Sequence, residues 1–99
     1  MTNELLSLIV GYLACGQIAE ERFLSPQEVQ YCSIIYQEIK LAFVPGVDTR
    51  QYAELSLSEQ HAVNTAGFTA FYAWRQDNPE TVSFLERVAR GEVQLGEAS

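Results

Sequence analysis

Basic residues are scarce in this 99-residue sequence. One lysine and five arginines stand against thirteen acidic residues, which gives a formal charge of −7. Binding to nucleic acid or to an anionic membrane requires clustered lysine and arginine, and here the cations are scattered along the chain. The sequence therefore predicts no direct contact with nucleic acid and no attachment to a membrane.

A long uninterrupted apolar run is also missing. The longest apolar stretch, residues 4–15 (ELLSLIVGYLAC), is shorter than the ~20 residues that a transmembrane helix needs. A signal peptide would carry positive charge ahead of this stretch, but Glu4 stands there instead. We therefore expect a soluble, cytoplasmic protein.

Cysteine is limited to Cys15 and Cys32, which lie in apolar, helix-like segments and form no C-x-x-C pair. Because cysteine packs like a small hydrophobic residue, the favoured interpretation is two buried free thiols, and a disulfide is the alternative. Free thiols would agree with a reducing compartment.

Catalytic and metal-binding signatures are absent from the sequence. It contains no glycine-rich phosphate loop, and the single histidine, His61, lacks zinc-ligand partners at recognised spacings. A Cys–His nucleophile pair is disfavoured because apolar surroundings raise the pKa of a thiol. Glu20 and Glu21 are adjacent, so they do not face one another on a helix. We therefore expect no enzyme, no metal site and no cofactor.

Signals for helix starts recur along the chain. Ser25-Pro26-Gln27-Glu28 and Ser56-Leu57-Ser58-Glu59 match the capping box, in which an N-cap serine pairs with a glutamate three residues later. Further cap signals occur at Thr2, Asp48, Asn78-Pro79 and Gly91. They predict helices over about 3–20, 26–44, 57–76 and 79–90, with a short helical turn near 48–55.

The expected fold is an all-α bundle of four main helices plus a possible short fifth, with no sheet. One domain would cover residues 1–91, and residues 92–99 would form a flexible tail. In the second helix the core-facing stripe is predicted to be Val29, Cys32, Tyr36, Ile39 and Phe43. In the third long helix, a row of small residues is predicted to allow close approach of another helix: Ala62, Ala66, Ala70 and Ala73.

The first two helices carry more apolar surface than one core-facing side requires. Residues 4–15 are apolar almost all round, so this helix either lies at the centre of the bundle or faces a partner. The second helix has apolar residues outside its stripe, among them Tyr31 and Ile34. On the second interpretation, the protein interface would comprise Leu5, Leu8, Ile9, Tyr12, Tyr31 and Ile34.

Elimination and this apolar excess together favour a non-catalytic regulator. The chain would be a homodimer that binds a protein target, such as a transcription regulator, and occludes a surface that the target needs. One alternative is an acidic mimic of nucleic acid that inhibits a nucleic-acid-binding protein. Another is an accessory subunit of an enzyme complex.

Overall fold

The computed structural model describes residues 2–98, and these form five α-helices, one 3-10 turn and no strand. The all-α fold predicted from the sequence is therefore confirmed. The helices are α1 (Asn3–Glu21), α2 (Pro26–Ala42), α3 (Thr49–Glu54), α4 (Leu57–Asp77) and α5 (Pro79–Ala89), and the 3-10 turn is η1 (Leu95–Ala98).

Most helices begin where the cap signals predict. The Thr2 hydroxyl accepts a hydrogen bond from the Leu5 amide at 3.1 Å, at the start of α1. Both predicted capping boxes form, at the start of α2 and of α4, and Asp48 makes a third with Gln51 at the start of α3. These contacts satisfy backbone amides that have no partner inside the helix.

The α4–α5 junction differs from the prediction in one detail. Asn78 is the N-cap residue of α5, but its side chain makes no N-cap hydrogen bond. Instead, its amide donates to the Trp74 carbonyl at 2.8 Å and so satisfies the end of α4. Pro79 begins α5, where its missing amide hydrogen costs nothing.

The end of α5 turns the chain back toward α1. Gly91 has φ +78°, and the amides of Gly91 and Glu92 donate to the carbonyls of Val88 and Arg87, which is the Schellman pattern. The chain then reaches η1, and Leu95 packs against the core. Part of the segment that was expected to be a tail is therefore in contact with the domain.

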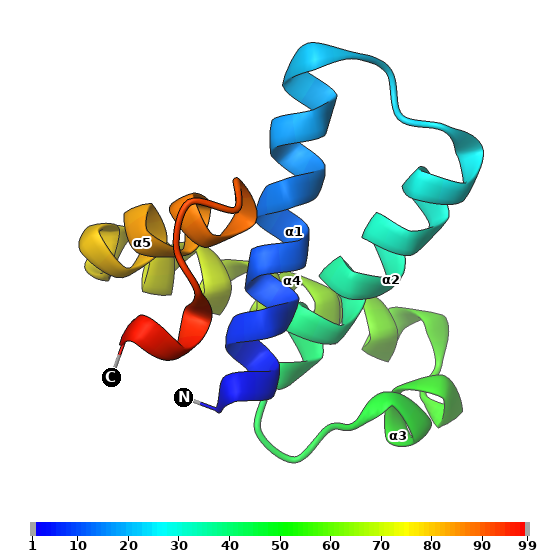
Figure 1. Ribbon diagram of the computed structural model, residues 1–99. Helices are drawn as coiled ribbons and strands as arrows, with labels where there is room; N and C mark the ends of the chain where they lie inside the picture. The colour runs from blue at the N-terminus through cyan, green and yellow to red at the C-terminus, as the bar shows by residue number, and fades with distance from the viewer. Residues whose placement is uncertain (1, 99) are drawn as a thin grey trace.

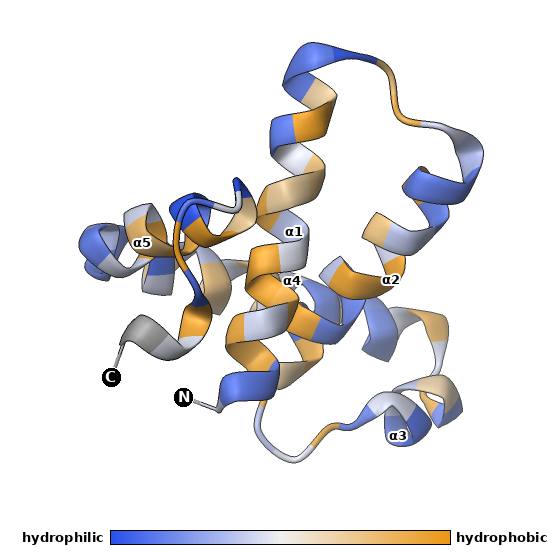
Figure 2. Cartoon of the chain, viewed as in Figure 1, coloured by the Kyte–Doolittle hydropathy of each residue, from blue (hydrophilic) through white to orange (hydrophobic). Residues whose placement is uncertain are grey.

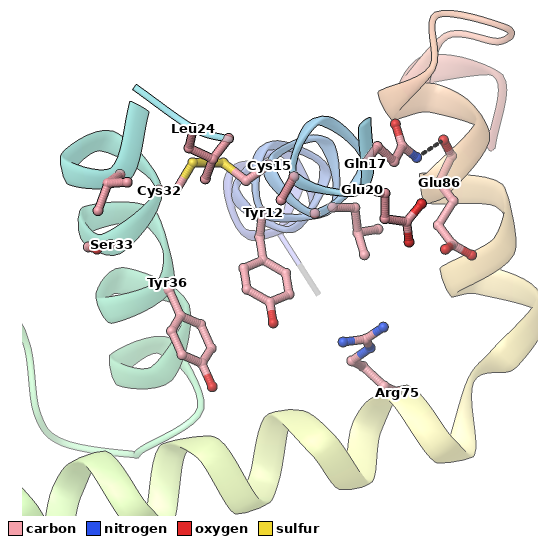
Figure 3. Close-up of a pocket in the computed structure, with 14 residues that line it drawn as sticks. Tyr12, Cys15, Gln17, Glu20, Leu24, Cys32, Ser33, Tyr36, Arg75 and Glu86 are labelled. Atoms are coloured by element: carbon pink, nitrogen blue, oxygen red, sulfur yellow. Dashed lines mark hydrogen bonds between the residues drawn. A yellow bond between two sulfur atoms is a disulfide. The ribbon is translucent and has the colours of Figure 1, made fainter. Parts of the chain in front are cut away.

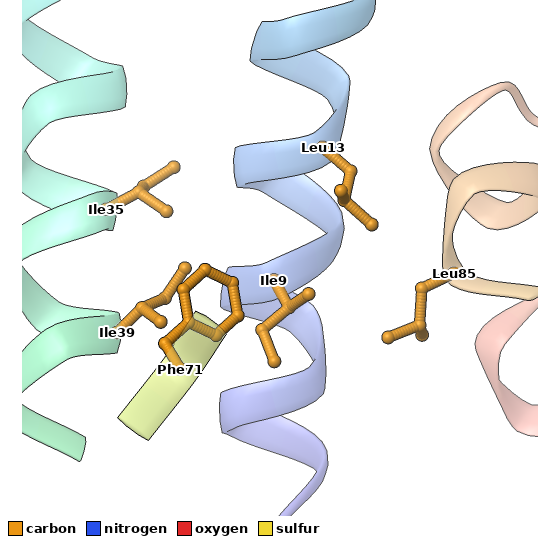
Figure 4. Close-up of a cluster of buried hydrophobic side chains, with 6 residues drawn as sticks. All are labelled: Ile9, Leu13, Ile35, Ile39, Phe71 and Leu85. Carbon is orange, nitrogen blue, oxygen red and sulfur yellow. The ribbon is translucent and has the colours of Figure 1, made fainter. Parts of the chain in front are cut away.

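Helix α1 runs through the middle of the molecule, with α2 on one side, α5 on the other and α4 passing behind (Figure 1). Ile9 and Leu13 on α1 belong to a buried cluster that includes side chains from all three of these helices, and Figure 4 shows Ile9 between Phe71 and Leu85. The buried cluster comprises Ile9, Leu13, Ile35, Ile39, Phe71 and Leu85. The apolar segments of α1 in Figure 2 lie where the helix passes between its neighbours, so most of its circumference is covered.

The close approach of α2 and α4 occurs at Gly67, and the alanine row predicted for that role is mostly exposed. A Cβ atom built on Gly67 would stand 2.4 Å from the Lys40 carbonyl oxygen, so only glycine allows this crossing. Leu41, which lies outside the predicted stripe of α2, is buried next to this crossing. Val29, which belongs to the stripe, is half exposed because α2 has diverged from the core there.

Helices α1 and α2 separate toward the loop that joins them, and this end projects from the rest of the molecule (Figure 1). The radius of gyration is 14.2 Å, against about 13 Å for a compact domain of 100 residues. The accessible surface is 6746 Å², whereas a folded monomer of this mass is expected to expose about 5,700 Å². The chain therefore presents more surface than a closed bundle would.

Candidate functional site

The six residues predicted to form an interface divide between the two helices. On α1, Leu5, Leu8 and Tyr12 are partly buried against the core, and Ile9 is only 1% exposed. On α2, Tyr31 is 62% exposed and Ile34 is 53% exposed. The structure therefore leaves Tyr31 and Ile34 free to meet a partner and encloses Ile9, for which a partner contact would require the core to open.

Tyr31 and Ile34 lie three residues apart on α2 and so share one side of that helix. We call this side the outer face of α2. The neighbouring residues on it are also exposed: Gln27, Gln30 and Glu38. The face thus has two large apolar side chains at its centre and polar side chains around them, which is the general layout of protein interfaces.

A second pair of exposed large side chains lies on α4. The rings of Phe68 and Tyr72 stack with centroids 6.1 Å apart, and both side chains are about half exposed. Phe71 and Trp74, from the same aromatic segment, point into the core instead. Of these four aromatic residues, only the second pair packs into the space between the helices.

Cys15 and Cys32 form a disulfide between α1 and α2, so the prediction of two free thiols is wrong. Their Cα atoms are 6.2 Å apart, within the range that a disulfide spans, because α1 and α2 pack side by side. Disulfides persist mainly in oxidising compartments. Cysteine usage therefore no longer supports a reducing compartment, and neither thiol is available as a nucleophile in this state.

The disulfide borders a groove of about 430 Å³ between the diverging parts of α1 and α2. We call this the α1/α2 groove, and Figure 3 shows the side chains that line it. Its apolar lining includes Gly16, Ala19, Leu24 and Val29, and α4 and α5 contribute Arg75 and Glu86. The groove is therefore open between two helices and bounded by two others.

Two tyrosines, one from α1 and one from α2, lie side by side in the groove. The rings of Tyr12 and Tyr36 stack with centroids 5.0 Å apart, and their hydroxyl groups point to the same side as Arg75 (Figure 3). Burial raises the pKa of Tyr36, Tyr12 raises it further, and the positive charge of Arg75 lowers it. Within the described residues, neither hydroxyl has a hydrogen-bond partner.

Arg75 supplies the positive charge of the groove. Its guanidinium lies 5.9 Å from the centroid of the Phe71 ring, and across residues 2–98 it makes no ion pair. On the side of α5, Gln17 donates a hydrogen bond to the Glu86 carbonyl at 3.0 Å, and the carboxylates of Glu20 and Glu86 line the groove there (Figure 3). The groove thus combines one unpaired cation with two carboxylates on its α5 side.

The remaining sequence candidate, His61, is exposed on α4. Among the described residues, no three histidine, cysteine or acidic side chains gather in a way that would hold a metal ion. In the same part of the chain, no helix is both long enough and apolar enough to span a membrane.

Sequence reasoning missed Arg75 because an isolated arginine at the end of a helix carries no local pattern. Its importance depends on the divergence of α1 and α2, which are distant from it in the sequence. Gly67 was missed because its single signal, one glycine inside a helical segment, does not say which helix approaches.

No family model, curated protein or solved structure matches this chain.

Proposed function

We propose that this chain is a non-catalytic regulator that binds a protein partner through the outer face of α2. Binding would occlude a surface that the partner needs for its own assembly or for its ligand. The observation that carries this proposal is the exposure of Tyr31 and Ile34, two large apolar side chains held on one side of a well-capped helix. The large accessible surface of the chain also supports it.

The chemistry of the partner follows from the charge of this chain. With a net charge of −7 and Glu38 beside Ile34, the complementary partner presents an apolar centre with basic residues around it. The apolar centre supplies the affinity, and the charged rim mainly increases the rate of association. Binding should therefore depend only weakly on salt.

A non-catalytic role agrees with the state of the candidate catalytic groups. The disulfide removes both thiols, and His61 lies exposed on α4 at a distance in sequence from either cysteine. Acid–base or nucleophilic catalysis requires positioned partners for such groups.

Without its partner, the chain is proposed to pair with a second copy through the same face, since a two-fold interface brings one patch against itself. Light scattering of the purified chain tests this. A mass of twice 11.1 kDa is expected for the wild type, and the monomer mass for Tyr31→Ser combined with Ile34→Ser. A wild-type chain that stays monomeric at high concentration would contradict self-pairing.

The disulfide favours an oxidising compartment over the cytoplasmic location expected from the sequence. Alkylation of free thiols in freshly lysed cells, followed by mass spectrometry of the chain, tests the compartment. No added alkyl group is expected, and two added groups would restore the cytoplasmic prediction.

Partner binding is tested by capture and reconstitution. The tagged wild type, the Tyr31→Ser and Ile34→Ser double variant, and Phe23→Ser are each used to capture proteins from native lysate. Phe23 is 98% exposed in the α1–α2 loop, so its variant controls for loss of apolar surface in general. The captured protein is then purified and its affinity measured at increasing salt.

The proposal expects the wild type and Phe23→Ser to bind with equal affinity and the double variant to lose at least tenfold. Equal binding by all three chains would overturn it. A steep loss of affinity with salt would favour acidic mimicry of nucleic acid instead, because that mode depends on charge pairs.

A further inference from the structure

We propose that the α1/α2 groove is a binding site for a small monocarboxylate with an aromatic or aliphatic body. The site uses residues other than the outer face of α2, so it goes beyond the proposed protein binding and does not depend on it.

The size and lining of the groove suit the apolar body of such a ligand. Small-molecule sites usually measure 300–1,000 Å³, and the groove has a volume of about 430 Å³. Leu24 and the disulfide provide apolar surface at the end nearest the α1–α2 loop (Figure 3), and Val29 adds to the apolar lining. The disulfide links the two walls, so the site is formed before the ligand arrives.

The opposite end of the groove suits a carboxylate. Arg75 enters it without an ion pair, and a guanidinium can donate two parallel hydrogen bonds to one carboxylate group. The hydroxyl groups of Tyr12 and Tyr36 face the same side, have no partner among the described residues, and can each donate one more. Three donor groups therefore face the same end of the groove.

Glu20 and Glu86 limit the charge of the ligand. Their carboxylates line the α5 side of the groove and would repel a second anionic group. A phosphate or a dicarboxylate is thus a poorer fit than a single carboxylate that lies toward the tyrosines.

The shape of the groove favours a small molecule over a helix from a partner protein. A helix with its side chains is about 10 Å across and requires a trough that is open at both ends. Here α4 passes across one end of the groove and places Arg75 there (Figure 3). A compact ligand whose acid group points toward α4 fits this arrangement.

A matched pair of probes tests the site on the full, oxidised chain. 2-Naphthoate and 2-naphthamide share an aromatic body and differ in charge, and their affinities can be measured by titration calorimetry and mapped by NMR. The wild type should bind 2-naphthoate about tenfold more tightly than 2-naphthamide, since a charge-assisted pair contributes about this factor. The resonances that move should be those of the groove residues.

Three variants assign the interaction. Arg75→Gln should remove the preference for 2-naphthoate, while Arg50→Gln, which changes an exposed arginine outside the groove, should keep it. Gly16→Leu should abolish binding of both probes, because the leucine side chain would occupy the groove that Gly16 lines. The variant should still fold, since there is open space around Gly16 and leucine has a high helix propensity. Circular dichroism checks that each variant is folded.

The site is overturned if neither probe binds the wild type at millimolar concentration, or if Gly16→Leu binds as well as the wild type. The carboxylate assignment is overturned if the wild type does not distinguish the probes, or if Arg75→Gln still does. If Arg75→Gln fails to fold, the two probes on the wild type and on Gly16→Leu still test whether the groove binds a monocarboxylate.

Discussion

Helices α1 and α2 have similar lengths, and α1 is the more apolar of the two, yet the exposed large apolar side chains lie on α2. Every large apolar residue of α1 between Leu5 and Leu13 is buried or partly buried, whereas Val29, Tyr31 and Ile34 of α2 are each about half exposed or more. The difference arises from position. Helix α1 has α2 and α5 on opposite sides, while α1 and α4 cover only part of α2. Apolar content alone therefore does not identify a binding face, because the number of neighbouring helices decides what remains exposed.

The two ends of the α1–α2 pair also differ in how much of their apolar surface is covered. At one end, Ile9, Ile35 and Ile39 pack with Phe71 in the core. At the other end, the disulfide and the ion pair between Arg22 and Glu28 hold the helices, and the groove opens between them. One end is stabilised by burial and the other by specific links, and this division can be tested residue by residue.

The largest expected effect separates two isoleucines on the same helix. Ile39 is fully buried and Ile34 is on the outer face, so Ile39→Ala should lower the free energy of unfolding by about 4 kcal/mol. At concentrations at which the chain is monomeric, Ile34→Ala should lower it by less than about 0.5 kcal/mol. Urea denaturation followed by circular dichroism measures both. Similar losses for the two variants would break the distinction between the covered and free sides of α2.

The next effect concerns the disulfide at the open end. Replacing both Cys15 and Cys32 by serine should lower the free energy of unfolding by about 3 kcal/mol, because a cross-link over 17 residues restricts the unfolded chain. Without the cross-link, α1 and α2 should also move relative to one another around the α1/α2 groove. This motion would appear as broadened NMR resonances for Leu24 and Val29. Sharp resonances and unchanged stability would show that packing alone holds this end.

Two glycines sharpen the comparison between crowded and open helix faces. Gly67→Ala should destabilise the fold by about 2 kcal/mol, since the added Cβ collides with the backbone of Lys40. Gly16→Ala should stabilise it by up to about 1 kcal/mol, because nothing lies within 4 Å and alanine favours the helix. Thermal unfolding of both variants measures the effects. A neutral Gly67→Ala would show that α2 and α4 do not cross closely.

The smallest effect is a pH dependence at the open end. Arg22 and the backbone of Ser25 lower the pKa of Glu28 to about 2. A carboxylate with a lowered pKa contributes stability above its unfolded pKa, near 4.3, and loses that contribution as the pH falls toward 2. Glu28→Gln should therefore flatten the decline in stability between pH 5 and 2. Glu38→Gln on the same helix is the control, and an equal flattening there would contradict the assignment.

Local signals in the sequence predicted much of the fold. Thr2, Ser25, Asp48 and Ser56 each cap a helix as expected, because an N-cap depends on three or four adjacent residues. Asn78 shows the limit, since its side chain had two helix ends within reach and bonded the preceding one.

The tertiary features were harder to predict. The Cys15–Cys32 disulfide and the Gly67 crossing depend on which helices are neighbours, and periodicity does not encode that pairing. The candidate site residues also divide into those with a local sequence signal and those that depend on which helices are neighbours. The exposure of Tyr31 and Ile34 could be predicted because these residues lie outside a helical stripe, whereas Arg75 lines the α1/α2 groove only through the arrangement of four helices.

The central claim is that the outer face of α2 meets a partner while α1 stays inside the bundle. Hydroxyl-radical footprinting of the free chain and of its complex with the captured partner tests this most directly. We expect rapid oxidation of Tyr31 and Ile34 in the free chain when it is diluted until light scattering shows the monomer mass. In the complex we expect strong protection of both residues, and little oxidation of Ile9 in either state. Unchanged oxidation of Tyr31 and Ile34 on binding, or protection confined to another face, would contradict it.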